Sequence, residues 1–200
     1  LFDKVVCATD SKKYAEIAIK YGAEVPILRP KKISGDKSCD FDWVNWILDF
    51  YKSKDIFFDL FSIIRPTSPF RDSKTILNGY KLFIKNYNNC DSMRAVELCK
   101  QHPGKMWKVK GDFIEPIIEG TNNGQPFHSS QYAALPKIYV QNASLEIAHT
   151  YVLKKYFNIS GKKIIPFFTN ESEGIDINSI DDWRVIKSLL DKKKLKLPKI

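Results

Sequence analysis

The chain has 200 residues, of which 44% are hydrophobic and 13% aromatic, so it can bury a sizeable core as one domain. No apolar run approaches the length of a membrane span, and the first residues lack the basic head and apolar block of a signal peptide. The formal net charge of +9 favours phosphorylated ligands, but it is spread along the chain without a basic and aromatic module. We therefore expect neither a membrane protein nor a nucleic-acid-binding protein.

The start of the chain and its cysteines indicate its context. Leu1 is not a methionine, and a strand-like run follows almost at once, so we expect further residues upstream. The four cysteines form no C-x-x-C pair and have no companion histidine at metal spacing. We expect them to be reduced thiols of a cytoplasmic protein rather than zinc ligands.

The first half of the chain alternates strand-like and helix-like patterns. Expected strands are short apolar runs, and expected helices have apolar residues at helical spacing after a capping residue. In chain order these are a strand at 4–9, a helix at 12–21, a strand at 24–28, a helix capped by Asp40, a strand at 57–64 and a helix at 73–87. The alternation predicts an α/β fold with a doubly wound, mostly parallel sheet.

The pattern changes after Asp91. Further strands are expected at 92–98, 137–148 and 164–169, followed by a closing helix. Residues 105–118 predict a β-hairpin with a turn after it, inside a segment of about 100–135 that is too polar to form its own core. We expect this segment to be an arm on a single domain that spans residues 1–200.

The strand at 57–64 is almost entirely apolar and ends in R-P-T-S-P-F-R, residues 65–71. Two prolines cannot continue a strand ladder, so these residues predict a loop at the carboxyl end of a central strand. Open α/β sheets bind ligands at that edge. We expect part of a binding site here.

A carboxylate and a carboxamide stand two residues apart before the closing helix, at Asp176 and Asn178. In an extended segment their side chains point the same way, so both could offer oxygens to one cation. Mg²⁺ takes only one or two protein carboxylates and completes its shell with water and phosphate oxygens. The alternative is that these two residues form an ordinary turn before a helix.

Segments from the whole length of the chain together resemble one family. They are F-D-K-V-V-C-A-T-D at 2–10, Y-G-A-E-V-P at 21–26, L-R-P at 28–30, R-P-T-S-P-F-R at 65–71, H-P at 102–103, L-P-K-I-Y at 135–139 and D-I-N at 176–178. In order and spacing they resemble the acylneuraminate cytidylyltransferases. The resemblance implies a doubly wound α/β nucleotidyltransferase fold, a homodimer, and Mg²⁺-dependent transfer of CMP from CTP to a nonulosonic, sialic-acid-like sugar, with release of pyrophosphate.

The same resemblance implies roles for individual residues. Arg29 and Asp10 match nucleotide-binding positions, although Arg29 could equally be an exposed surface arginine. Lys105 matches a lysine that the partner subunit's arm supplies to the sugar site, and the alternative is a solvated hairpin lysine. Asp176 is implied as the catalytic metal ligand, with Asn178 as a weaker metal ligand.

The implied sugar pocket contains Arg65, Asn142 and Glu146, and it departs from the family pattern at two of them. Arg65 replaces the common glutamine before P-T-S-P, and Glu146 replaces a pocket tyrosine. A sialate enzyme is therefore not assumed. A legionaminate-type or pseudaminate-type sugar, or a different sugar, stays open.

Two further departures concern catalysis. The family's glycine-rich A-R-G-G-S-K loop should precede Leu1, and Asn178 stands where an aspartate is common. This chain as given is therefore expected to be a poor catalyst by itself. A catalytically weak relative that binds nucleotide or a partner through the arm remains an alternative. A glycosyltransferase of the GT-A type is another, although it should carry its metal motif in mid-chain.

Overall fold

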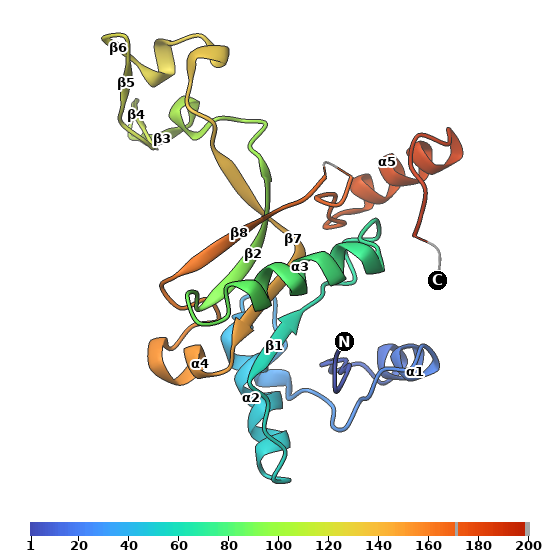
Figure 1. Ribbon diagram of the computed structural model, residues 1–200. Helices are drawn as coiled ribbons and strands as arrows, with labels where there is room; N and C mark the ends of the chain where they lie inside the picture. Colours follow the sequence, from blue (N-terminus) through green and yellow to red (C-terminus); the bar gives the residue numbers. More distant parts are fainter. Residues whose placement is uncertain (171, 199–200) are drawn as a thin grey trace.

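The structure is a computed structural model that describes residues 1–170 and 172–198, and Figure 1 shows a sheet with helices around it and an arm projecting from one end. The helices are α1 (Lys12–Lys20), α2 (Asp40–Lys52), α3 (Ser73–Lys85), α4 (Tyr151–Tyr156) and α5 (Ile180–Asp191). The strands of the main sheet are β1 (Leu60–Ile63), β2 (Ser92–Leu98), β7 (Tyr139–His149) and β8 (Ile164–Phe168). Only α4, which follows β7 directly, has no counterpart among the expected elements.

The main sheet has the strand order β1-β7-β2-β8. β2 and β8 are parallel, whereas β7 runs antiparallel to both β1 and β2. Three strands therefore share one direction, and β7 lies between two of them in the opposite direction. The reason is the path of the chain, because β2 leads out into the arm and β7 returns from it. The α/β class is confirmed, but only one of the three pairings within this sheet is parallel.

The two strands expected near the N-terminus are reduced to one parallel bridge between Val6 and Glu24. The Cys7 amide donates to the Glu24 carbonyl at 2.9 Å, and the Glu24 amide donates to the Val5 carbonyl at 2.8 Å. Among the described strands, neither segment joins the four-stranded sheet. Val5 is 57% exposed, so this pairing buries little apolar surface. Burial of side chains against neighbouring strands is what stabilises a longer strand.

Helices cover both faces of the sheet. On one face α3 packs against β2, β7 and β8, and Phe83, Met93 and Leu145 there have no exposed surface. Gly79 of α3 faces Leu145, and a Cβ at this position would overlap the leucine side chain. The opposite face carries a second cluster, which α2 and α4 cover. The helices are therefore fixed to the sheet by two separate apolar cores.

The arm contains β3 (Trp107–Lys110), β4 (Phe113–Pro116), β5 (Thr121–Asn122) and β6 (Gln125–Pro126), and it extends away from the sheet beyond β2 and β7 (Figure 1). β3 pairs with β4, and β5 pairs with β6, as the predicted hairpin and turn require. His102 is buried at the base of the arm, where its ring contacts the Pro136 carbonyl and the Gly104 amide, each at 3.0 Å.

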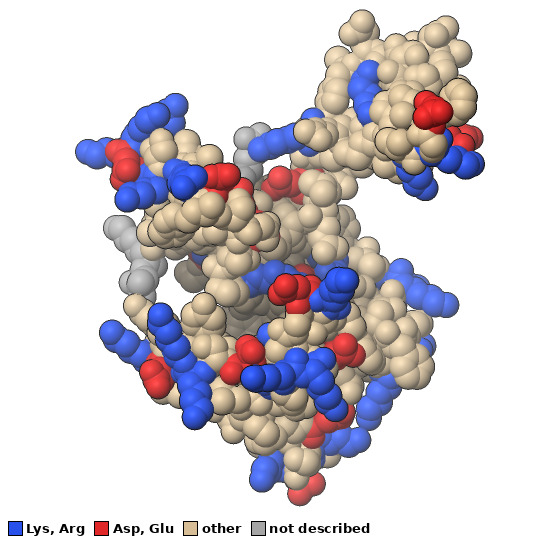
Figure 2. Space-filling model, turned by 180° about the vertical axis from the view of Figure 1, so that it is seen from behind, with Lys and Arg blue, Asp and Glu red and all other residues tan. Residues whose placement is uncertain are grey.

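Positive charge is distributed over the surface. Figure 2 shows Lys and Arg side chains over the sheet domain, the peripheral helices and the arm, with Asp and Glu side chains among them. This distribution of charge over the surface matches the even spread of charged residues along the sequence.

Within residues 1–170 and 172–198, no helix is long and apolar enough to cross a bilayer.

Candidate functional site

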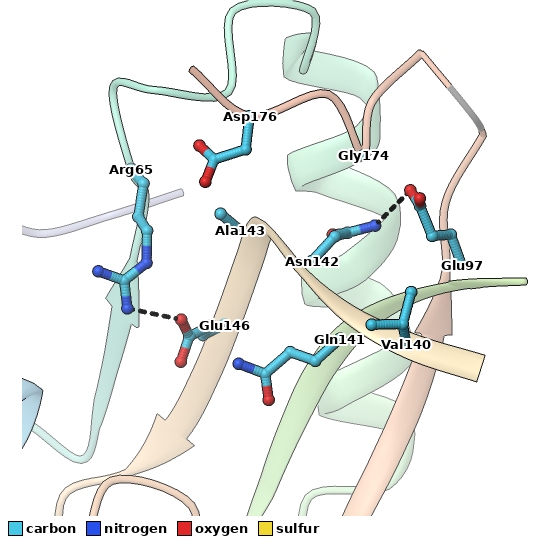
Figure 3. Close-up of a pocket in the computed structure, with 9 residues that line it drawn as sticks. All are labelled: Arg65, Glu97, Val140, Gln141, Asn142, Ala143, Glu146, Gly174 and Asp176. Carbon is cyan, nitrogen blue, oxygen red and sulfur yellow. Dashed lines mark hydrogen bonds and ion pairs between the residues drawn. The ribbon is translucent and has the colours of Figure 1, made fainter. Parts of the chain in front are cut away.

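A pocket of about 300 Å³ lies where β1, β2 and β7 meet the segment that leads to α5 (Figure 3). Most of its wall is polar. The lining residues are Arg65, Glu97, Val140, Gln141, Asn142, Ala143, Glu146, Gly174 and Asp176. Four residues to which the sequence resemblance assigned substrate or metal roles thus line one cavity, although they come from three separate parts of the chain.

An irregularity in β7 forms one side of the pocket. Arg94 of β2 faces Glu146, but two residues later Val96 already faces Gln141. Residues 142–145 of β7 therefore stand opposite the single residue Ala95. Such bulges bend a strand and redirect its side chains, and they are common beside active sites. Here the bulge brings Asn142 and Ala143 to the cavity wall.

Asp176 reaches the pocket because its segment is tied to the proline-containing loop after β1. The Ile177 amide donates to the Thr67 carbonyl at 2.9 Å. The Asn178 amide group donates to Oδ2 of Asp176, also at 2.9 Å, so the two side chains do point the same way. Oδ1 of Asp176 is buried and has no hydrogen-bond partner among the described residues.

Arg65 and Glu146 bind each other directly. Nη2 of Arg65 lies 3.1 Å from Oε1 of Glu146 and 2.5 Å from a carboxylate oxygen of Asp40. Oε2 of Glu146 is paired with Arg94. Burial alone would raise the pKa of Asp40, but the hydrogen bonds from Arg65 and Trp43 outweigh it and lower that pKa. The pKa of Arg65 is raised, chiefly by its hydrogen bond to Asp40.

Asn142 makes hydrogen bonds within the pocket wall. Its amide nitrogen donates to Thr169 Oγ1 at 2.8 Å and to Glu97 Oε2 at 3.2 Å, and its oxygen accepts the Ser144 amide at 3.2 Å. Gly174 packs against Glu97 so closely that any Cβ would overlap the carboxylate. Asn142 therefore joins the bulge of β7 to β2 and to the chain that follows β8.

Arg71, the last residue of the R-P-T-S-P-F-R segment, stabilises the loop after β1. Its guanidinium donates to the Ser144 carbonyl at 2.5 Å and to the Arg65 carbonyl at 3.0 Å. Burial lowers the pKa of Arg71. The side chain thus links the bulge of β7 to the backbone of Arg65.

Four other residues with roles implied by the resemblance lie outside the lining of this pocket, namely Asp10, Arg29, Lys105 and Asn178. The Arg29 amide donates to the Thr9 carbonyl at 2.8 Å, which places Arg29 beside Asp10, and its side chain donates to Ser34 Oγ at 3.0 Å. Lys105 lies in the arm, where its ammonium group donates to the carbonyls of His128 and Ser130 at 3.2 and 2.8 Å.

Sequence reasoning missed three charged residues of the site. Asp40 was expected to cap α2, but Cys39 occupies the cap position, and Asp40 begins the helix with its carboxylate bound to Arg65. Arg94 and Glu97 belong to β2, whose other residues are mostly apolar. The sequence did carry a signal for them, namely two charged residues inside an otherwise mostly apolar strand, because buried charges are normally paired with a partner.

The residues present fit a magnesium ion. The buried and unpartnered Oδ1 of Asp176 lacks the hydrogen bond that such an atom normally has. Across residues 1–170 and 172–198, no cluster of three or more His, Cys, Asp or Glu side chains could hold a metal. A single carboxylate suits Mg²⁺, which takes most of its ligands from water and phosphate.

The fold has a known counterpart among solved structures. No family model matches the chain. The structure of CMP:2-keto-3-deoxy-manno-octonic acid synthetase complexed with CTP is similar with a TM-score of 0.57 and 11% identity, over 95% of this chain and 81% of that one. The chain therefore has a nucleotidyltransferase fold, as predicted.

Proteins of similar sequence indicate which kind of nucleotidyltransferase the chain resembles. The chain is 27% identical to the CMP-N,N'-diacetyllegionaminic acid synthase of Legionella pneumophila, over 94% of this chain and 78% of that protein. It is also 27% identical to the post-translational flagellin modification protein B of Campylobacter coli, over 98% of this chain and 80% of that protein. A segment of 83 residues is 39% identical to the N-acylneuraminate cytidylyltransferase of Escherichia coli and covers 19% of that protein. The predicted resemblance to the cytidylyltransferases of CMP-nonulosonic acids is confirmed.

Proposed function

We propose that this protein is a cytidylyltransferase that transfers CMP from CTP to a nonulosonic acid and releases pyrophosphate. The observation that carries the proposal is the pocket in which Arg65, Asn142, Glu146 and Asp176 converge. The similarity of the chain to a CMP-N,N'-diacetyllegionaminic acid synthase supports the reaction class, and the nucleotidyltransferase fold supports a nucleotide as substrate. The cytoplasm, where CTP is available, is the proposed location.

In this reaction a sugar hydroxyl oxygen attacks the α-phosphorus of CTP, and the bond from that phosphorus to the pyrophosphate oxygen breaks. The site must hold the two reactants together and balance the triphosphate's charge. Asp176 would hold Mg²⁺ through Oδ1, and Asn178 would orient Asp176 through their hydrogen bond. When bound, the ion supplies charge stabilisation to the phosphate oxygens. Arg29 and Asp10 are the proposed nucleotide contacts outside the pocket.

The sugar pocket favours a substrate other than N-acetylneuraminate. Arg65 and Glu146 form an ion pair in the wall where the sialate pattern has neutral and aromatic side chains. We expect the full-length enzyme to prefer a deoxy-diamino nonulosonic acid by at least about tenfold in kcat/KM, or about 1.4 kcal/mol. Pyrophosphate release from CTP, measured with a panel of sugars, tests both the reaction and the preference.

The matched control for that preference is the double variant Arg65→Gln/Glu146→Tyr, which restores the sialate pattern at both positions. This variant should reduce or reverse the preference for a deoxy-diamino nonulosonic acid over N-acetylneuraminate. Equal or better use of N-acetylneuraminate by the wild-type enzyme would contradict the specificity but keep the reaction. No pyrophosphate release with any sugar would refute the proposed function.

A homodimer formed through the arm is part of the proposal. The β3–β4 hairpin exposes large apolar side chains on both of its faces, including Val109 at 79% and Phe113 at 78%, and a monomer would leave them in water. We expect a dimer at micromolar concentration in sedimentation, and we expect Phe113→Glu to shift it to monomer. Phe157→Glu is the control, because Phe157 is 77% exposed but lies outside the arm, after α4. A wild-type monomer under these conditions would exclude this assembly.

A further inference from the structure

Four charged side chains form a continuous chain beside the pocket, in the order Asp40, Arg65, Glu146 and Arg94. They come from the start of α2, the loop after β1, β7 and β2. Glu146 is the centre of this chain, since each of its carboxylate oxygens contacts a different arginine. Its side chain is only 6% exposed, and that of Arg94 is 12% exposed. Arg94 is held in turn by Ser160 Oγ at 2.5 Å.

The register of the sheet explains why these residues meet. Glu146 stands directly opposite Arg94 in one pairing and opposite Ile63 in the other. Arg65 follows Ile63 by two residues in the loop after β1, and its ion pair with Glu146 places its guanidinium on the same side of the sheet as Glu146. Ile63 belongs to the apolar cluster under α2 and α4, so the four charges continue this cluster toward the pocket.

The charges within this chain balance. Arg65 lies between two carboxylates, Asp40 and Glu146, and Glu146 lies between two arginines. A guanidinium has five N–H donors, of which Asp40 takes two and Glu146 takes one. Arg65 lines the pocket, and its other two N–H donors have no acceptor among the described residues. Arg65 therefore offers the pocket hydrogen-bond donors but little net positive charge.

We propose that Asp40 and Arg94 are positioning residues for sugar recognition, which fix and neutralise Arg65 and Glu146 so that Arg65 donates to an uncharged oxygen of the sugar rather than to its carboxylate. This inference rests on the proposed function and concerns residues outside the pocket lining. Glu146 then acts as a link between the two arginines. The carboxylate of the sugar must be bound by other groups.

Asp40→Asn tests the proposal by whether it raises or lowers the KM for the sugar. The substitution keeps the shape of the side chain but removes its charge, which loosens Arg65 and leaves it more positive. If Arg65 donates to an uncharged oxygen, the KM for the sugar should rise about tenfold while the KM for CTP stays within about twofold. If Arg65 binds the sugar carboxylate, the additional positive charge should lower the sugar KM.

Two variants on the same helix make the test specific. Asp40→Glu keeps the carboxylate and should hold the sugar KM within about threefold of wild type. Asp42→Asn removes a charge from the same first turn of α2. Among the described residues the Asp42 carboxylate accepts a side-chain hydrogen bond from Cys39 alone, so this variant reports any effect on the helix dipole. It should leave both KM values unchanged.

Arg94→Lys is the second, independent test. It keeps the positive charge beside Glu146 but removes the planar group that also reaches Ser160. Its sugar KM should rise without a matching rise in the KM for CTP. A sugar KM that is unchanged or lower in Asp40→Asn, or a parallel rise in the KM values for sugar and CTP, overturns this inference but leaves the proposed function standing. A wild-type enzyme with no turnover overturns the proposed function and this inference with it.

Discussion

Asp176→Ala in the full-length enzyme should lower the rate of pyrophosphate release from CTP by at least about a hundredfold, because it removes a buried carboxylate oxygen that has no hydrogen-bond partner among the described residues and is available to a cation. The fold should persist, since Asp176 accepts a single protein hydrogen bond, from Asn178. Steady-state kinetics with Mg²⁺ and a nonulosonic acid, together with circular dichroism, measure both expectations.

Asp181→Ala is the matched control for this variant. Asp181 lies five residues further on, in the first turn of α5, and is exposed. Among the described residues its carboxylate pairs with Arg184 alone. It should leave turnover within about twofold of wild type, as expected for an exposed ion pair. Asn178→Asp should be tolerated, or should lower the Mg²⁺ concentration needed for half-maximal activity, because it adds a second carboxylate. Near-normal turnover in Asp176→Ala would refute the metal assignment.

Glu146→Ala should lower the free energy of unfolding by about 3 kcal/mol, because it leaves the nearly buried guanidinium of Arg94 without its carboxylate. Arg65 loses one of its two acidic partners in the same substitution. Urea denaturation, followed by tryptophan fluorescence, measures the change through the midpoint at constant slope.

The double variant Arg94→Met/Glu146→Leu distinguishes the loss of an ion pair from the loss of packing. It removes both charges and refills the space with apolar groups, so it should recover at least half of the stability that Glu146→Ala loses. Glu16→Ala on the exposed side of α1 is the surface control and should stay within about 0.5 kcal/mol of wild type. A loss below about 1 kcal/mol in Glu146→Ala would contradict the charge chain as a structural element.

Much of the local structure could be predicted because it depends on residues that are close in sequence. Apolar spacing predicted α1, α2, α3 and α5, and the predicted bounds of α1 and α3 agree with the structure to within two residues, because the boundary signals were local side chains. Ser179 and Asp182, for example, form a reciprocal capping box at the start of α5. The spacing of Asp176 and Asn178 likewise predicted that their side chains would point the same way, as their hydrogen bond shows.

The candidate site was predicted in part, and for a different reason. Arg65, Asn142, Glu146 and Asp176 were chosen through the family resemblance, and the structure brings them to one cavity. The roles of these residues stay predictions until the variants are measured. Asp40 and Arg94 could not be assigned to the site in this way, because no local pattern marks which distant charge a given side chain will meet.

The sequence by itself determined the alternation of helices and strands, the polar arm, the segments that carry the family resemblance, and the local contacts at the ends of helices. Only the tertiary structure decided the direction of β7, its bulge at 142–145, and the contacts of Arg65 and Arg94 with Glu146 across 81 and 52 residues. The physical reason is that strand register selects cross-strand partners. A shift of one residue would turn Glu146 to the opposite face, among the apolar side chains under α3.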